Sequence, residues 1–417
     1  MIGDKKEKEM RIKFLKDIGP GIVVAATGVG AGDMIAASVA GAKYGTVIIW
    51  AAIVGAVIKY VLNEGMARWQ LATGTTVLQC WRQRFPALVS IYFMVYLFLW
   101  GFIVGGALIA ACGLAAHAIF PFLSVETWGV LHSLIALLLI YVGRYQLIEI
   151  LMKFFIGLMF GVVCASAILI HPDWGEILKS LAVPQLPLGS TIFILGVIGG
   201  VGGTVTMLSY GYWIREKKWM GKSFYKQART DLIAAYFLTG LFGMAIMIIA
   251  AGVKPEVITG NKMVIGLAEQ MGRVVGPIGR WIFLIGFWGA VFSSMLGVWQ
   301  GVPYLFSDFV RVYKNKSAAI SETSIDVRSR DYMFFLFYLA IPPMTLLFFG
   351  KPVWVVVIYS IIGAFFMPFL AVLLLIMNNK IKWVKDLKNN LVVNILLFAG
   401  LVLFVVLCMK EIWQRLF

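Results

Sequence analysis

Apolar runs recur along the whole chain of 417 residues, separated by short polar segments. Each run is about 20 residues long, which is the length an α-helix needs to cross the hydrocarbon of a bilayer. Charged residues make up 13% of the chain and hydrophobic residues 61%, against roughly 25% and 45–50% in soluble domains. These figures exclude soluble, disordered and collagen-like proteins. We predict an all-α polytopic membrane protein, because near-continuous apolar runs differ from the alternating strands of a β-barrel.

The boundaries of the spans follow from the apolar runs and from the charged residues that interrupt them. Eleven membrane helices are predicted, near residues 18–42, 46–63, 88–117, 128–142, 154–170, 188–213, 232–253, 281–306, 333–349, 353–377 and 391–409.

The formal charge of +16 raises the question of a nucleic-acid partner, but the distribution of the charge argues against one. With the N-terminus in the cytoplasm, the cytoplasmic segments hold 25 of the 36 lysines and arginines and the outer segments hold 9. This asymmetry follows the positive-inside rule, by which cytoplasmic loops carry the excess of lysine and arginine. Basic loops are also attracted to anionic lipid headgroups. We therefore predict an integral protein of a bacterial-type cell membrane, with a cytoplasmic N-terminus, an outer C-terminus and no nucleic-acid partner.

Chemical motifs of enzymes are missing from the sequence. The four cysteines are scattered without a Cys-x-x-Cys pair, so neither a disulfide framework nor a zinc site is indicated. No nucleophile–base set, carboxylate cluster or phosphate-binding loop is recognisable. We expect no enzymatic activity and no cofactor. The expected partners are the lipid bilayer and a transported ion or small solute, with a proton or sodium as coupling ion if transport is coupled.

Two spans carry glycine clusters at their centres, three glycines within 28–32 and four within 199–203. Each glycine costs a helix about 1 kcal/mol relative to alanine. One interpretation is close packing of helices through small residues. The other is that both helices unwind there and turn backbone groups toward a cavity. Because the two clusters lie five spans apart, they favour unwinding and indicate an inverted-repeat transporter with its site at the membrane midplane.

Polar residues beside these clusters are the candidate binding residues. Asp33 is either the N-cap of the second half-helix or a carboxylate that ligates a cation or carries a proton. Hydroxyls follow the second cluster, although threonines in membrane helices often bond to a preceding carbonyl. The predicted substrate-binding residues are Thr27, Gly28, Gly30, Asp33, Gly202, Gly203, Thr204, Thr206, Met207 and Tyr210, with Asp33 as the candidate metal ligand.

Other polar residues within the spans are given structural roles or left open. Glu–Arg and Glu–Lys pairs at i,i+4 predict local ion pairs, and one lysine has no partner within a turn. The predicted ion pairs are Glu64–Arg68 and Glu149–Lys153, and Lys59 is the lysine without a partner. We expect Ser293, Ser294 and Gln300 either to line the pathway or to join helices. His132 is expected to be a hydrogen-bonded structural residue.

Four segments together resemble a known family. They are GPGIVVAATGVGAGDMIAASVAGAKYG from residue 19, MARWQLATG from 66, YQLIEILMKFFIG from 145 and IGFWGAVFSSMLGVWQG from 285. They are similar to segments of the NRAMP (natural resistance-associated macrophage protein) divalent-metal transporters. The resemblance implies a LeuT-type fold in a single transporter domain, with a cytoplasmic segment 1–17, inverted five-helix repeats at 18–170 and 188–377, and an extra helix at 391–409.

The family's metal-binding motifs are altered in this chain. An Asp-Pro-Gly-Asn motif aligns with residues 30–33, which read Gly-Ala-Gly-Asp, and a Met-Pro-His-Asn motif aligns near 203–206, which read Gly-Thr-Val-Thr. The resemblance implies a secondary active transporter of a divalent metal, either manganese- or iron-like or hydrated and magnesium-like. The alternative is a LeuT-fold transporter of a small organic acid or amino acid, since a half-helix N-terminus favours an anionic group.

Overall fold

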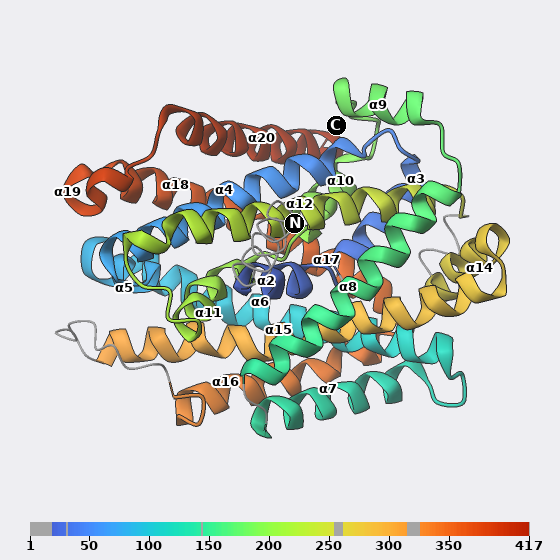
Figure 1. The fold of residues 1–417 in the computed structure, drawn as a ribbon, viewed down its shortest axis with the longest axis horizontal. Helices are drawn as coiled ribbons and strands as arrows, with labels where there is room; N and C mark the ends of the chain where they lie inside the picture. Colours follow the sequence, from blue (N-terminus) through green and yellow to red (C-terminus); the bar gives the residue numbers. More distant parts are fainter. Residues whose placement is uncertain (1–18, 31, 143–144, 254–261, 315–325, 417) are drawn as a thin grey trace, which may run out of the picture.

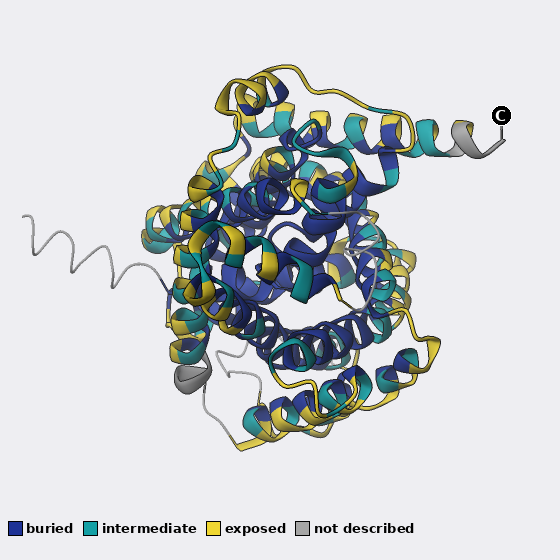
Figure 2. Ribbon diagram, turned by 90° about the vertical axis from the view of Figure 1, so that its right-hand side faces the viewer, coloured by how far each residue is buried: buried dark blue, intermediate teal, exposed yellow. Residues whose placement is uncertain are grey.

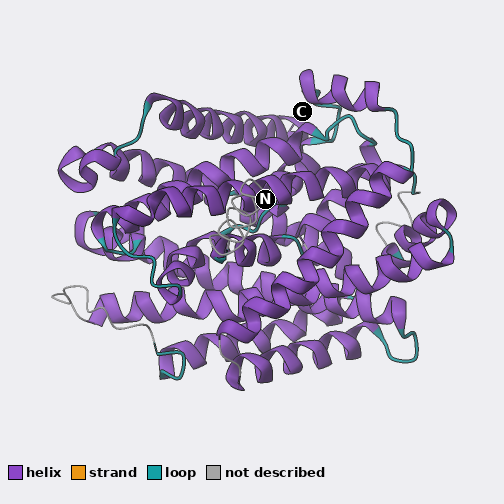
Figure 3. Cartoon of the chain, in the orientation of Figure 1, coloured by secondary structure: helices purple, strands orange, loops and turns teal. Residues whose placement is uncertain are grey.

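The computed structural model describes residues 19–30, 32–142, 145–253, 262–314 and 326–416. Within these ranges the chain is helical and forms no strand, as Figure 3 shows. The elements are α2 (Pro20–Gly28), η1 (Gly32–Ala36), α3 (Ala37–Tyr44), α4 (Trp50–Thr73), α5 (Val77–Arg84), α6 (Ala87–Ile119), α7 (Val125–Val142), α8 (Tyr145–Leu169), α9 (Trp174–Ala182), α10 (Thr191–Gly200), η2 (Val205–Ser209), α11 (Tyr210–Glu216), η3 (Lys222–Phe224), α12 (Tyr225–Ala251), α14 (Met263–Val275), α15 (Pro277–Lys314), α16 (Arg330–Ala340), η4 (Pro342–Phe349), α17 (Pro352–Ala364), α18 (Phe366–Asn379), α19 (Ile381–Val384), η5 (Lys385–Leu387) and α20 (Leu391–Leu416).

Ten of the eleven predicted spans are found as apolar helices long enough to cross a membrane. Among the described residues, nine helical stretches are long and apolar enough to cross a membrane, and α2 with the helix that follows its break forms a tenth. Helix α4, which contains the predicted second span, is not among these candidates, although its 24 residues reach about 36 Å. Its hydropathy is lowered by polar residues that are buried inside the protein, among them Lys59, Asn63 and Glu64.

The discontinuous helices lie at the centre of the bundle. Helix α2 contacts α12, α15 and α8, and α10 contacts α17 and α4. Helices α7 and α20 lie at opposite edges of the molecule in Figure 1, with α20 packed on α18 and α4. The elements that carry the glycine clusters are therefore enclosed by the continuous helices.

Burial follows the same pattern. In Figure 2 buried residues fill the centre of the bundle and exposed residues lie on its periphery. Many large apolar side chains are exposed there, including Leu88 on α6 and Phe348 on η4. In water such a surface would drive aggregation, whereas a bilayer covers it with apolar tails. The outer surface is thus that of a membrane protein.

Short helices outside the spans begin at conventional polar caps. Thr76 and Gln79 form a capping box at the start of α5, in which each side chain accepts a hydrogen bond from the other residue's backbone N–H. Asp173 accepts the N–H of Glu176 at the start of α9, and Ser329 likewise accepts the N–H of Tyr332 where the membrane span that begins with α16 starts. These caps satisfy N–H groups that lack a partner in the first turn and fix where the connecting segments end.

Candidate functional site

The first membrane helix is interrupted where its glycines cluster. Helix α2 ends at Gly28, and the chain resumes at Gly32 as a π-helical segment that continues into α3. The two parts meet at an angle of 43°. The interruption predicted for this helix is confirmed.

The sixth helix is interrupted in the same manner. Helix α10 ends at Gly200, and a non-helical stretch leads into the 3-10 segment η2 and then α11. Gly202 and Gly203 have φ of +72° and +68°. Glycine adopts this left-handed conformation freely, whereas other residues are strained in it. The second cluster therefore both breaks the helix and permits the turn.

The two breaks pack directly against each other. A Cβ atom on Gly28 would overlap the backbone of Gly202 and Gly203. A Cβ atom on Gly32 would lie 3.1 Å from the Cα of Gly200. The glycines thus serve both roles considered from the sequence, since they interrupt the helices and also allow the interrupted backbones to touch.

Asp33 joins the two breaks electrostatically. It lies in the first turn of η1 with 1% of its surface exposed, and its Oδ2 accepts a hydrogen bond from the N–H of Gly202 at 3.3 Å. Its Oδ1 is buried without a hydrogen-bond partner. Among the described residues, the side chain of Asp33 receives no bond from its own half-helix, so it faces the opposite break and does not act as an N-cap.

The hydroxyls on α2 and α15 hold these helices together. Thr27 Oγ1 donates to the carbonyl of Val23 at 2.6 Å, and the carbonyl of Thr27 accepts from Ser294 Oγ at 2.6 Å. Ser293 Oγ lies 3.4 Å from the carbonyl of Ala26. The bonds from Ser293 and Ser294 satisfy carbonyls in the last turn of α2, which have no helical partner, whereas the bond of the Thr27 hydroxyl lies within α2. A Cβ atom on Gly30 would meet the side chain of Ser294, so this glycine also packs on α15.

The residues after the second break divide into two groups. Thr204 Oγ1 donates to the carbonyl of Gly199 at 2.9 Å, and the hydroxyl of Thr206 lies against Gly203. The side chain of Met207 is fully buried in η2. Tyr210 lies apart, because its hydroxyl donates to Asp231 Oδ2 at 3.0 Å, near the other end of α2.

Lys59 is the principal residue for which the sequence suggested no partner. It is fully buried on α4, and its Nζ donates to the carbonyl of Gly199 at 2.7 Å. Asp33 lies at the same break, because its Oδ2 accepts from the N–H of Gly202, three residues after Gly199. The structure therefore brings a buried ammonium to the same place as the buried carboxylate.

Asp231 on α12 is a site residue that the sequence analysis missed. It accepts hydrogen bonds from the N–H groups of Gly19 at 3.0 Å and Gly21 at 2.6 Å, and so caps α2 from another helix. A carboxylate at this end also complements the helix dipole. An acidic residue directly before the apolar run at 232–253 was the available signal, but its partners lie more than 200 residues away in the chain.

A further buried carboxylate, Asp308, connects α11 to its neighbours. Asp308 on α15 accepts hydrogen bonds from Thr76 at 2.7 Å and Tyr212 at 2.8 Å and pairs with Arg311 at 2.7 Å. Nearby, Trp213 donates to Gln300 at 2.6 Å. These bonds tie α5 and α11 to α15, and they assign Gln300 to helix contact.

The predicted local ion pairs are confirmed, and both gain partners from distant segments. Glu64 pairs with Arg68 at 3.3 Å and also accepts from the hydroxyl of Tyr225 at 2.7 Å. Glu149 pairs with Lys153 at 2.7 Å and with Lys217 at 2.8 Å.

The structural role predicted for His132 is also confirmed. Its Nδ1 hydrogen-bonds to the carbonyl of Trp128 at 2.7 Å, and its Nε2 accepts from Trp288 Nε1 at 2.8 Å. The imidazole is therefore held on both sides by its neighbours.

The polar groups at the break are oxygen donors. No group of three or more His, Cys, Asp or Glu side chains that could hold a metal occurs among the described residues. The break instead offers one carboxylate, backbone carbonyls and hydroxyls. Such oxygen ligands bind hard cations that keep part of their water shell.

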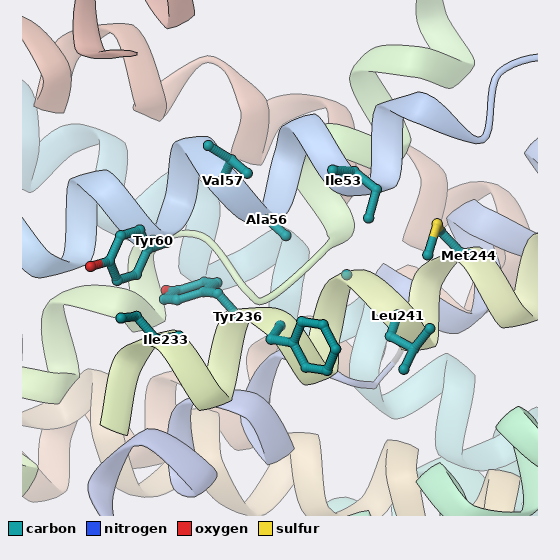
Figure 4. Close-up of a pocket in the computed structure, with 10 residues that line it drawn as sticks. Ile53, Ala56, Val57, Tyr60, Ile233, Tyr236, Leu241 and Met244 are labelled. Atoms are coloured by element: carbon teal, nitrogen blue, oxygen red, sulfur yellow. The ribbon is translucent and has the colours of Figure 1, made fainter. Parts of the chain in front are cut away.

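An apolar pocket lies outside the break, between α4 and α12 (Figure 4). Its volume is about 300 Å³, and its walls are apolar except for Tyr60 and Tyr236. Tyr236 forms the wall nearest the break, because its ring packs against Gly202. An apolar pocket of this kind does not bind ions, so we place the candidate site at the break and not here.

The sequence matches the family model described as natural resistance-associated macrophage protein-like over residues 21–414. Among curated proteins, the chain is similar to the divalent metal cation transporter MntH of Chromohalobacter salexigens, with 23% identity over 73% of either chain. MntH of Bacillus subtilis is 22% identical over 67% of this chain and 68% of its own.

Solved structures of similar fold include a manganese transporter and a protein in complex with L-phenylalanine. A manganese transporter variant of Eremococcus coleocola has a TM-score of 0.73 at 15% identity, covering 95% of this chain and 86% of its own. MhsT in complex with L-phenylalanine has a TM-score of 0.60 at 15% identity, covering 94% and 98%. These likenesses show a LeuT-type fold. With the family match over nearly the whole chain, they establish that this integral membrane protein belongs to the natural resistance-associated macrophage protein-like (Nramp) family of transporters.

Proposed function

We propose that this protein moves a divalent metal ion across the membrane by alternating access, with Asp33 as the charged ligand. The observation that carries the proposal is the buried Oδ1 of Asp33, which has no hydrogen-bond partner at the contact of the two breaks. A buried carboxylate oxygen without a partner is costly, so a ligand that it binds compensates that cost. The similarity to MntH transporters of divalent metal cations supports the same substrate class.

The ligand set favours a partly hydrated ion. One carboxylate with carbonyls and hydroxyls offers no sulfur or imidazole, which are the ligands that select soft and borderline metals. Magnesium keeps several of its waters when bound by one or two carboxylates. We therefore place hydrated magnesium first, with manganese and iron as the other candidates. Thr27, Gly28, Gly30, Gly202, Gly203, Thr204, Thr206 and Met207 complete the proposed site, whereas Tyr210 supports it through Asp231.

The burial of the proposed site residues supports alternating access. The side chains of Thr27, Asp33 and Thr206 expose at most 4% of their surface. An ion reaches them only when helices move, so the described conformation is closed. We assign the two moving halves to repeats at 18–170 and 188–377, with 391–409 as an additional helix. The distribution of basic residues supports a cytoplasmic N-terminus and an outer C-terminus in a cell membrane.

The direct test is ion uptake into proteoliposomes that contain the purified full chain and an enclosed metal-sensitive dye. We expect uptake of Mg²⁺, Mn²⁺ or both by the unmodified protein. Asp33→Asn should lower the initial rate by about tenfold or more, because an interaction with a charged group is worth about 1.5–3 kcal/mol. Asp33→Asn should melt at a temperature close to that of the unmodified protein. A loss of uptake is then not explained by unfolding.

Glu176→Gln is the matched control, because Glu176 is an exposed carboxylate on α9. This variant should transport like the unmodified protein. Absence of Mg²⁺ and Mn²⁺ flux from the unmodified protein, together with flux of an organic acid or amino acid, would refute the metal substrate. Unchanged flux in folded Asp33→Asn would refute the role of Asp33.

A further inference from the structure

Lys59 places a positive charge where the broken sixth helix ends. Its Nζ donates to the carbonyl of Gly199, the penultimate residue of α10. The last carbonyls of a helix have no helical partner and carry the negative end of the helix dipole. In transporters with discontinuous helices, such C-terminal ends and unwound carbonyls bind coupling cations. The ammonium of Lys59 therefore stands where a bound cation would otherwise be stabilised.

Asp33 supplies the counter-charge without closing an ion pair. Both residues lie at the break, but among the described residues they do not form an ion pair within 4.0 Å. Asp33 Oδ2 bonds to the N–H of Gly202 instead, and Oδ1 remains free. Lys59 thus offsets the negative charge of the break while leaving one carboxylate oxygen for a ligand.

A neighbouring residue extends this arrangement along α4. Asn63 lies one turn after Lys59, is fully buried and donates through Nδ2 to the hydroxyl of Tyr236 at 3.0 Å. Its Oδ1 is also buried without a hydrogen-bond partner. Tyr236 in turn packs against Gly202. The face of α4 that carries Lys59 is therefore connected to the break by side-chain contacts as well as by charge.

We propose that the ammonium of Lys59 is a tethered cation that replaces a bound monovalent coupling ion at the C-terminal end of α10. Burying an ammonium is costly, and an apolar side chain of similar length would pack at lower cost if the charge had no role. The tethered charge holds α4 against α10 and balances Asp33. Transport by the unmodified protein is then independent of sodium and potassium. This last consequence rests on the proposed function, whereas the cation site itself does not.

The test compares thermal melting of the detergent-purified full chain in choline, sodium, potassium and methylammonium chloride at constant ionic strength. The unmodified protein should melt at one temperature in all four salts. Lys59→Ala should melt lower in choline and recover by a saturable rise of a few degrees in sodium or methylammonium, since ligands that bind the folded state stabilise it. Lys59→Met fills the space with apolar atoms and should show no such recovery.

A double-mutant cycle of Asp33 and Lys59 provides a second readout if Lys59→Ala does not fold. Asp33→Asn combined with Lys59→Met should melt higher than the sum of the two single effects predicts, because removing both charges leaves neither uncompensated. Lys382→Ala, which removes an exposed lysine on α19, is the control and should respond equally to all four salts. Additive effects of Asp33→Asn and Lys59→Met would overturn the proposal, and so would Lys59→Ala folding without any cation response.

Uptake measurements separate this inference from the proposed function. In proteoliposomes, metal uptake by Lys59→Ala should require sodium or methylammonium, whereas uptake by the unmodified protein should not. If the unmodified protein moves no divalent metal, the proposed substrate is wrong, and the melting experiments still decide the role of Lys59. A sodium requirement in the unmodified protein would show that Lys59 does not replace the coupling ion.

Discussion

At the scale of single residues, the buried charges have different tasks that their positions in the chain do not reveal. Asp231 accepts two backbone N–H groups at the start of α2 and the hydroxyl of Tyr210. Asp33, at the break of the same span, has one weakly held oxygen and one free oxygen. The saturated carboxylate positions the helix, and the unsaturated one is available to a ligand.

Asp231→Ala should therefore destabilise the protein. The N–H groups of Gly19 and Gly21 would lose their acceptor in a buried setting, at a cost of about 1–3 kcal/mol. We expect a lower melting temperature in detergent. Asp386→Ala is the control, because Asp386 pairs with Lys222 on the exposed surface and should leave the melting temperature unchanged. Equal melting of the two variants would contradict the capping role.

At the scale of elements, each break depends on backbone contact with the other. Gly28 touches Gly202 and Gly203, and Gly32 touches Gly200. Side chains at these positions would push the half-helices apart, because closely packed interiors tolerate little added volume. The site is thus built by the mutual fit of two interrupted helices.

Gly28→Ala should impair both folding stability and transport. The added methyl group overlaps backbone atoms, which cannot rotate away as a flexible side chain can. We expect a lower melting temperature and a reduced rate of uptake in proteoliposomes.

Gly157→Ala is the matched control on α8. A Cβ atom there meets nothing within 4 Å. This change should be neutral or should stabilise the helix by up to about 1 kcal/mol, since alanine favours helix over glycine. If Gly28→Ala had the same melting temperature and uptake rate as Gly157→Ala, the contact between the breaks would be needed for neither stability nor transport.

At the scale of the whole molecule, the bundle is closed around the breaks. Asp308 joins α5, α11 and α15, and the site side chains are buried. Opening therefore requires these helices to separate. Cys80 on α5 is a natural reporter of that movement, because it is buried and outside the spans.

The reactivity of Cys80 should be low in the closed molecule. Burial raises the pKa of its thiol to about 12, although Arg84 and Lys380 act in the opposite direction. Only the thiolate reacts with maleimide, so at pH 8 the reaction should be far slower than at an exposed cysteine and should quicken as the pH rises toward 12. The measurement uses a variant in which the other three cysteines are alanine, with Lys382→Cys as the exposed reference.

Asp308→Ala should raise that reactivity. The change removes the acceptor of Thr76 and Tyr212, so α5 is released more easily from α11 and α15. We expect faster labelling of Cys80 at pH 8 in the folded variant. Unchanged labelling would show that Asp308 does not hold the bundle closed.

The sequence determined the features that depend on local composition. Apolar runs set the number of spans, and the glycine clusters marked both interruptions, because hydrophobic length and glycine's helix cost are properties of a short segment. The i,i+4 pairs at Glu64 and Glu149 were also predictable from spacing. The motifs shared with the family indicated its fold. Because the residues of the metal-binding motifs are altered, the motifs did not identify the transported substrate.

Only the tertiary structure decided how distant residues meet. Lys59 finds its acceptor 140 positions away, and Asp231 caps a helix more than 200 positions away. Tyr210 lies beside a predicted site yet bonds to Asp231. Such partners are chosen by the packing of helices, since a buried polar group must satisfy its hydrogen bonds with whatever the fold brings near it.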